Sequence, residues 1–410
     1  MENSERNLEK YAAVAVNIGL NVQKGQEVLI NASLDSASLV RKIVAKAYEA
    51  GAKNVLVEWN DNQITLTKYK SAPDEAFKKF PKWKADGYLE MAKNGAAFLN
   101  VTAPNPDLLS DVDPKRIGNW RKTSAIAMKE FSNQIMSGKV NWSSVVTPTK
   151  EWAKKLFPEL NDDESINKLW EYIFQITRAN SNDPVQAWEK HGKNLKKRLE
   201  YLSNKKYKRL IYTGEGTDLT IELPDTHVWI GGGSTTESGI FFVPNVPTEE
   251  VFTAPLRDGV NGTVKSTMPL NYGSSLIENF SFTFENGKVV DFSAEKGYET
   301  LKRMLDTDEG ALYLGEVALV PNDSPISNTG IIFYNTMYDE NASCHLALGN
   351  IYQSCVEGGN KMNSEELKNN NLNTSLIHVD FMIGSPDLCI DGETQDGKIE
   401  SVFKNGDWAI

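Results

Sequence analysis

Cysteine and histidine are scarce in this chain of 410 residues, which contains three cysteines and four histidines. Cys344, Cys355 and Cys389 form no CxxC pair, which argues against a disulfide framework and against a zinc site built from thiolates. No run of about 18 apolar residues occurs, so we expect no membrane span. The charged first ten residues do not resemble a signal peptide. These features predict a cytoplasmic protein with free thiols.

An excess of basic residues is also lacking. The formal net charge is −11, whereas a protein that binds nucleic acid regardless of sequence needs a basic surface. We therefore expect neither nucleic acid nor a membrane as a partner. The hydrophobic content of 40% and the charged content of 24% are those of an ordinary globular protein, and the length allows two domains.

The first half of the chain alternates between strands and helices. Helices are predicted over residues 4–18 and 36–50, and further helices are predicted to open at Asp113-Pro114, Thr147-Pro148 and Asp183-Pro184, where a cap residue precedes a proline. Strands are predicted at 27–31, 54–59 (of the buried kind), 96–101 and 139–146. This order is typical of a parallel sheet with helices on its faces.

From about Tyr207 onward, short strands and turns dominate. Phe280, Phe282 and Phe284 alternate with polar residues, and residues 285–288 then predict a hairpin turn. Only residues 295–305 and a short stretch at 364–368 read as helices, while the asparagine-rich segment 363–373 suggests a surface loop. We predict an α/β N-terminal domain with a mostly parallel sheet over residues 1–205, and a β-rich α+β C-terminal domain over 206–410.

Two ionisable side chains share one face of a predicted strand at residues 375–383. His378 and Asp380 lie two residues apart and point away from the apolar face formed by Ile377, Val379 and Phe381. Placing a charge in such a strand costs several kcal/mol unless it has a partner. A divalent metal, a basic side chain or a mutual hydrogen bond would each supply one.

Further acids and one more histidine lie in the same half of the chain. Glu316 interrupts the apolar run 310–320, where an edge strand or a buried salt bridge is the alternative to a metal. The other candidates are Glu249, Glu250, Glu340 and His345. The acids Glu250, Glu316, Glu340 and Asp380 sum to −4, which two divalent cations neutralise and one does not. Carboxylates with two histidines suit zinc, cobalt, manganese or iron.

These segments together resemble one known family. PTEEVFT around Glu249 and Glu250, the pair Gly315-Glu316, DENASCHLALG from Asp339, Tyr352 and His378-Val-Asp380 are similar to the aminopeptidase T family of two-metal exopeptidases, which includes the enzymes called AmpS and PepS. The resemblance covers nearly the whole chain. No single segment is a tight motif such as HExxH, so the resemblance to the family rests on all these segments together.

The resemblance implies a cytoplasmic, homodimeric aminopeptidase that acts on peptides with a free N-terminus. It carries the metals in the β-rich domain. Its implied ligands are Glu250, Glu316, His345, His378 and Asp380, with Glu316 bridging, Glu340 as a further ligand and Tyr352 beside the metals. Two divalent ions are implied, with zinc or cobalt first and manganese, iron or magnesium as alternatives.

The mechanism expected from this set is metal-assisted hydrolysis of an amide. Tyr352 would stabilise the oxyanion, and Glu316, Glu249 or Glu340 would carry the proton to the leaving amine. Two other interpretations stay open at this point. One is a two-metal hydrolase of another amide or of a phosphoester, and the other is a binding protein that holds no metal.

Overall fold

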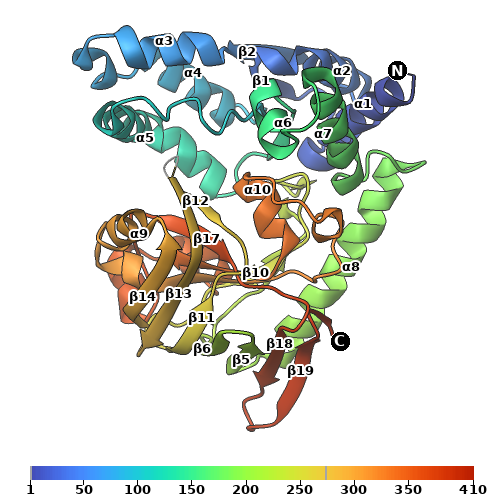
Figure 1. The fold of residues 1–410 in the computed structure, drawn as a ribbon. Helices are drawn as coiled ribbons and strands as arrows, with labels where there is room; N and C mark the ends of the chain where they lie inside the picture. Colours follow the sequence, from blue (N-terminus) through green and yellow to red (C-terminus); the bar gives the residue numbers. More distant parts are fainter. Residues whose placement is uncertain (1, 273–274) are drawn as a thin grey trace. The chain divides into compact units, whose positions relative to one another are not determined.

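The computed structural model describes residues 2–272 and 275–410 and divides into two compact units. The first comprises Met1–Lys190 and Gly233–Pro247, and the second comprises His191–Gly232 and Thr248–Ile410. Colours from blue to green in Figure 1 follow most of the first unit, and yellow to red follow most of the second. Asn245 in the later segment of unit 1 forms a parallel bridge with Ser144, which attaches that segment to the sheet of its unit.

Unit 1 is built on a four-stranded parallel sheet with the order β2-β1-β3-β4. Its strands are β1 (Glu27–Ser33), β2 (Asn54–Asn60), β3 (Ala97–Thr102) and β4 (Trp142–Val146). The parallel sheet predicted from the alternation of strands and helices is therefore confirmed. The buried character predicted for β2 is wrong, because β2 is an edge strand that leaves Leu56 45% and Trp59 41% exposed.

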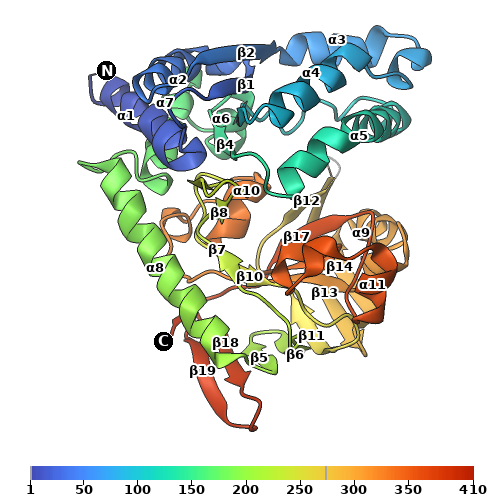
Figure 2. The same ribbon diagram turned by 180° about the vertical axis from the view of Figure 1, so that it is seen from behind.

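Helices cover this sheet, as Figures 1 and 2 show. They are α1 (Glu2–Val14), α2 (Ala37–Glu49), α3 (Asn62–Ser71), α4 (Lys82–Lys93), α5 (Pro114–Met136), α6 (Lys150–Leu156) and α7 (Asp162–Ile176). The start of α8 (Pro184–Lys205) belongs to the same unit and packs at the end of α7, where Trp188 donates to the carbonyl of Thr177. Tyr88 of α4 and Phe131 of α5 pack edge to face on each other and lie against Phe98 of β3. A short two-stranded sheet of β8 (Ser234–Thr235) and β9 (Phe241–Phe242) completes the unit.

Some helix boundaries agree with those predicted from capping residues in the sequence, and others do not. Asp113 caps α5 as predicted, because its carboxylate accepts from the backbone N–H of Lys115 at 2.9 Å. The start predicted at Thr147 is wrong: α6 begins at Lys150, because the Thr149 hydroxyl accepts from the N–H of Trp152 at 3.1 Å. The first helix also differs, since α1 ends at Val14 and the chain continues as a π-helix over Ala15–Leu20.

Unit 2 contains a nine-stranded sheet with the order β12-β13-β11-β6-β5-β18-β19-β20, in which β14 pairs with β13. Its strands are β5 (Arg209–Gly214), β6 (Thr217–Glu222), β11 (Val260–Lys265), β12 (Leu270–Tyr272), β13 (Ser275–Glu285), β14 (Lys288–Lys296), β18 (Cys389–Glu393), β19 (Ile399–Lys404) and β20 (Asp407–Trp408). The hairpin predicted at 285–288 is confirmed, with Asn286 and Gly287 at positive φ between β13 and β14. Figure 2 shows the dark red hairpin of β18 and β19 at one end of this sheet.

A second, five-stranded sheet in unit 2 is antiparallel throughout, with the order β17-β16-β15-β10-β7. Its strands are β7 (Ile230–Gly231), β10 (Val251–Thr253), β15 (Leu314–Leu319), β16 (His345–Gly349) and β17 (His378–Met382). One large hydrophobic cluster joins the two sheets; in it, Phe381 of β17 contacts Phe280 and Phe282 of β13 at ring-centroid distances of 5.9 and 5.2 Å. The predicted β-rich character of this part of the chain is confirmed.

Residues 191–205 of α8 belong to unit 2, where Leu195 and Leu202 join its hydrophobic cluster. The helices α9 (Tyr298–Leu305), α10 (Thr336–Asp339) and α11 (Ser364–Asn369) also accompany its sheets. The helix predicted from residue 295 begins later, at Tyr298, because β14 runs on to Lys296 and Gly297 adopts a left-handed conformation. In the described parts of the chain, no helix is both long and apolar enough to cross a membrane.

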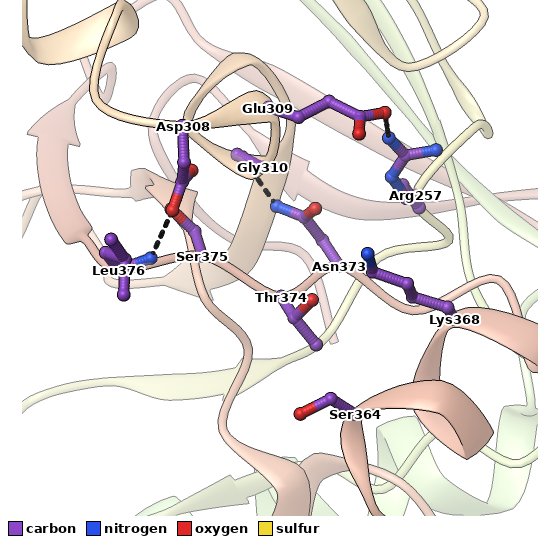
Figure 3. Close-up of a pocket in the computed structure, with 10 residues that line it drawn as sticks. All are labelled: Arg257, Asp308, Glu309, Gly310, Ser364, Lys368, Asn373, Thr374, Ser375 and Leu376. Atoms are coloured by element: carbon purple, nitrogen blue, oxygen red, sulfur yellow. Dashed lines mark hydrogen bonds and ion pairs between the residues drawn. The ribbon is translucent and has the colours of Figure 1, made fainter.

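Polar contacts, of which those of Asn373 are buried, fix the entries to β15 and β17 around a pocket of about 330 Å³ (Figure 3). Asp308 accepts from the hydroxyl of Ser375 at 2.7 Å and from the backbone N–H of Leu376 at 2.6 Å. Asn373 donates its amide to the carbonyls of Gly310 at 2.8 Å and Gly349 at 2.6 Å. The segment 363–373 is therefore not simply a surface loop, since Asn373 is only 1% exposed and braces the strands.

Candidate metal centre

Three neighbouring strands bring four of the predicted ligands to one face of the five-stranded sheet. Glu316 of β15 pairs with Ala347 of β16, and Ala347 pairs in turn with Asp380 of β17. Paired residues in an antiparallel sheet project from the same face, as do residues two apart along a strand. His345 and His378 therefore share the face of Glu316 and Asp380, and the small Ala347 separates the two carboxylates.

A β-bulge at Gly315 directs Glu316 to this face. Leu314 pairs with Leu348, but Glu316 pairs with Ala347, so β15 contains one extra residue at this point. The extra residue reverses the alternation, which leaves Leu314 in the hydrophobic core and turns Glu316 away from it. Gly315 fits because a Cβ there would lie 2.4 Å from the carbonyl oxygens of both Gly349 and Asn350.

Glu250 reaches the same place from the segment that precedes β10. Its Oε2 lies 3.1 Å from Nε2 of His345, while Oε1 of Glu316 lies 3.5 Å from that same nitrogen. On the other side, Nε2 of His378 lies 3.5 Å from Oε2 of Glu316 and 3.3 Å from Oδ1 of Asp380. Glu316 thus stands between two histidine–carboxylate pairs and shares one oxygen with each.

Both histidines direct Nε2 at the acids. Nδ1 of His345 lies 3.1 Å from the carbonyl of Ser343, and Nδ1 of His378 lies 2.7 Å from the carbonyl of Asn350. Because a carbonyl oxygen can only accept, Nδ1 carries the proton in each ring. Nε2 of a neutral ring then offers a lone pair toward carboxylate oxygens, an arrangement that requires a cation between them, either a proton or a metal.

The pKa values of the cluster show the same demand for positive charge. Burial raises the pKa of the Glu316 carboxyl to about 7, and it raises that of Glu340 well above its usual range with help from Asp380 and Glu250. Burial alone would lower the pKa of His345, yet its hydrogen bonds to Glu250 and Glu316 raise it well above normal. The pKa of His378 is raised to about 9 against the effect of burial, through its hydrogen bond to Asp380.

The residues present fit a pair of divalent metals. Two groups of three could each hold an ion, Glu250 with Glu316 and His345, and Glu316 with His378 and Asp380; within each group the ligand atoms lie within 4.8 Å of one another. Oε2 of Glu316 is buried and has no hydrogen-bond partner among the described residues. A buried carboxylate oxygen left unpaired in this way is suited to coordinating a metal ion.

Of the three further predicted site residues, Tyr352 and Glu340 lie beside this cluster, and Glu249 points toward His191. Tyr352 packs its ring edge on against His378, with centroids 4.9 Å apart. Glu340 opens the 3-10 helix Glu340–Ala342 and belongs to neither three-residue group, although the acids of both groups affect its pKa. The carboxylate of Glu249 lies elsewhere, with Oε2 at 3.5 Å from Nε2 of His191.

Sequence reasoning missed the residues that hold these side chains in place. His191 also contacts the carbonyl of Thr248 at 2.8 Å, yet its position in a basic helical stretch gave no sign of this contact. Asn341 accepts from the backbone N–H of Glu249 at 2.7 Å. Asp339 accepts from the N–H groups of Phe333 at 2.7 Å and Asn335 at 3.0 Å. Asp339 and Asn341 lie directly before and after Glu340 in the sequence, and this adjacency is the signal by which they could have been found.

Comparison with known proteins identifies the family to which the chain belongs. A family model described as thermophilic metalloprotease (M29) matches residues 4–408. The chain is 54% identical to Aminopeptidase 2 of Geobacillus stearothermophilus over 410 residues, which are 100% of this chain and 99% of that protein. It is 53% identical to Aminopeptidase AmpS of Bacillus subtilis (strain 168), with 100% of both chains covered.

A solved structure shares the whole fold. Wild-type AmpT from Thermus thermophilus superposes with a TM-score of 0.93 at 41% sequence identity, with 99% of each chain covered. The α/β region followed by a β-rich region, predicted from the sequence, is confirmed by this match and by the sheets described above. The resemblance found in the sequence is confirmed as well, and the chain belongs to the M29 family of metalloproteases.

Proposed function

We propose that this protein is a two-metal aminopeptidase that releases single residues from the free N-terminus of peptides. The observation that carries the proposal is the convergence of two histidine–carboxylate groups on the buried carboxylate of Glu316. The names of the relatives support the direction of cleavage, since those enzymes are called aminopeptidases.

Six side chains would hold the metals. Glu250 and His345 would bind one cation, His378 and Asp380 the other, and Glu316 would bridge the two. Glu340 would complete the set from its 3-10 helix. Zinc and cobalt suit this mixture of carboxylates and imidazoles, ahead of manganese, iron or magnesium.

The chemistry supplied by two bound cations is activation of a water molecule, whose pKa falls toward about 7, together with polarisation of the scissile carbonyl. The protein's part is to fix the ligands. Nδ1 of His345 and of His378 each donate to a backbone carbonyl, which orients the rings and raises the basicity of Nε2.

Tyr352 would donate a hydrogen bond to the oxyanion that forms on the attacked carbonyl. Its ring is held edge on between His378 and Phe252, at centroid distances of 4.9 and 5.6 Å. Loss of water around the hydroxyl and the nearby carboxylates of Glu316, Asp380 and Glu340 raise the pKa of the phenol above its usual value. Tyr352 therefore stays protonated at neutral pH and remains a donor.

A carboxylate would carry the proton to the leaving amine. Glu316 has a pKa of about 7 in the metal-free cluster because of its burial, but bridging two cations would remove its basicity. Glu340 and Glu249 are the other candidates, and Glu249 is 4% exposed beside His191. Each of the three can be tested by replacement with glutamine.

The proposal predicts a strict need for a free amino end and for metal. We expect single residues to be released in order from a short peptide, and we expect no release from the same peptide with an acetylated N-terminus. Treatment with a chelator should abolish the reaction, and zinc or cobalt should restore it. Mass spectrometry of timed digests gives the order of release directly.

A phosphoester substrate serves as the matched alternative. If the metal-loaded protein hydrolyses a phosphoester and leaves both peptides intact, the two-metal centre serves another reaction and the proposed activity is wrong.

We further propose that the protein is a cytoplasmic homodimer, as the resemblance implies. Light scattering during size-exclusion chromatography measures the mass of the particle and tests the dimer.

A further inference from the structure

Strand pairing accounts for only part of the proposed metal centre. Glu316, His345, His378 and Asp380 lie on β15, β16 and β17, where the register of the sheet fixes them. Glu250 and Glu340 do not: Glu250 precedes β10, and Glu340 begins a 3-10 helix. Another interaction must therefore hold these two carboxylates beside the other four side chains.

The side chain of Asn341 connects the two irregular segments. It is fully buried, and its Oδ1 accepts from the backbone N–H of Glu249 at 2.7 Å. Its Nδ2 donates to the carbonyl of Met337 at 3.0 Å and to Oε1 of Glu340 at 3.4 Å. The first bond fixes the Thr248–Glu249 peptide, one residue ahead of the one that leads into Glu250, and the others close the turn that presents Glu340.

We propose that Asn341 is a positioning residue for one half of the metal centre. It fixes the position of Glu250, and Glu250 in turn completes the group of Glu250, Glu316 and His345. The group of Glu316, His378 and Asp380 lies on β15 and β17, and none of the three hydrogen bonds of the Asn341 side chain reaches it. The inference rests on the proposed two-metal function and predicts that the two ions respond differently to one substitution.

The isosteric Asn341→Leu removes all three hydrogen bonds. It leaves the N–H of Glu249 buried without an acceptor, so the segment must shift to find one, and Glu250 moves with it. Asn341→Asp keeps an acceptor oxygen in the same place and preserves the bond to Glu249. The aspartate variant loses the two donated bonds but should restore the position of Glu250.

Metal content and affinity are the deciding measurements. By elemental analysis after dialysis, we expect two zinc ions per wild-type chain and one per N341L chain. By competition with a chromophoric chelator, we expect the affinity of N341L for the lost ion to be reduced by about 10- to 100-fold or more. N341D should bind two. If N341L does not fold, Asn341→Ala, which adds no bulk, takes its place.

Asn141→Leu is the matched control. Asn141 is 1% exposed in unit 1, where its amide donates to the carbonyl of Leu20 at 2.6 Å. N141L should lower stability and keep both ions. Two ions bound to N341L with wild-type affinity would overturn the role of Asn341 while leaving the two-metal function intact. An equal loss of bound zinc in N341L and N341D would do the same. Fewer than two ions in the wild type would overturn the proposed function and this inference with it.

Discussion

Oε2 of Glu316 lies 3.5 Å from Nε2 of His378, and this buried oxygen has no hydrogen-bond partner in the described part of the chain. The other oxygen of Glu316 lies 3.5 Å from Nε2 of His345. One carboxylate therefore faces the Nε2 atoms of two imidazoles whose Nδ1 atoms donate to backbone carbonyls. Cations between these atoms satisfy all three side chains at once, and the proposed chemistry follows from that requirement.

Gly315→Ala should impair the site without removing a ligand. A Cβ at this position would lie 2.4 Å from the carbonyl oxygens of Gly349 and Asn350, so the bulge must move and Glu316 must turn. We expect a loss of stability of about 1–3 kcal/mol and weaker metal binding. Urea unfolding and metal titration measure the two effects. Unchanged metal affinity in G315A would show that the bulge does not aim Glu316.

Ala347→Leu should fill the space between Glu316 and Asp380. Ala347 is fully buried and pairs with both residues across the sheet, so a larger side chain would enter the region between the carboxylates. The variant should lose metal and peptidase activity and about 1–3 kcal/mol of stability. Ala347→Ser adds a single oxygen and is the control. Full metal loading in A347L would contradict the geometry.

Tyr352→Phe should separate catalysis from metal binding. The phenol contributes a hydrogen-bond donor, and its ring contacts with His378 and Phe252 are retained in phenylalanine. We expect kcat to fall on the order of 100-fold, with KM and metal content close to those of the wild type. Steady-state kinetics on one peptide gives both constants. A rise in KM at constant kcat would instead assign Tyr352 to substrate binding.

Metal affinity should rise with pH. The pKa of Glu316 is raised to about 7 by burial, and that of His378 to about 9 by Asp380 against the effect of burial, so the metal-free cluster holds protons at neutral pH. A metal must displace them, which favours binding as the pH increases from about 6 to 9. Titration calorimetry in buffers of different protonation enthalpy should reveal proton release. A pH-independent affinity would contradict this.

Glu400 should contribute stability that is lost in acid. Hydrogen bonds from Lys205, Lys398 and Tyr207 lower the pKa of its carboxyl to about 2, below the value of about 4.3 expected in the unfolded chain. Its contribution is therefore present above pH ~4.3 and disappears as the pH falls toward 2. The difference in unfolding free energy between wild type and Glu400→Gln should shrink from pH 6 to pH 3. A difference that grows in acid would reverse the assignment.

Local and periodic signals in the sequence predicted much of this structure. Asp113 before a proline marked the start of α5, and the alternation around His378 and Asp380 placed both side chains on one face of β17. Glu316 stood out because it was an acid inside an apolar run. Each of these features is readable from neighbours along the chain.

Features that depend on distant segments could not be predicted in the same way. The bulge at Gly315 is defined by its pairing with β16, and without it the alternation along β15 would place Glu316 on the side of Leu314. Asn341 and His191 act on the segment of Glu249, which is remote from both along the chain. The start of α6 differs from the prediction because the proline after Thr147 pointed to that residue as the cap, whereas the cap hydrogen bond is made by Thr149.

Anomalous diffraction from crystals grown with zinc would locate the bound ions and show whether Glu316 lies between two of them. We expect two peaks per chain, about 3.5–4 Å apart, one on each side of the Glu316 carboxylate. In Glu316→Gln crystals, both peaks should weaken or vanish because both ions lose their shared ligand. A single peak, or two peaks that are unaffected by E316Q, would contradict the account.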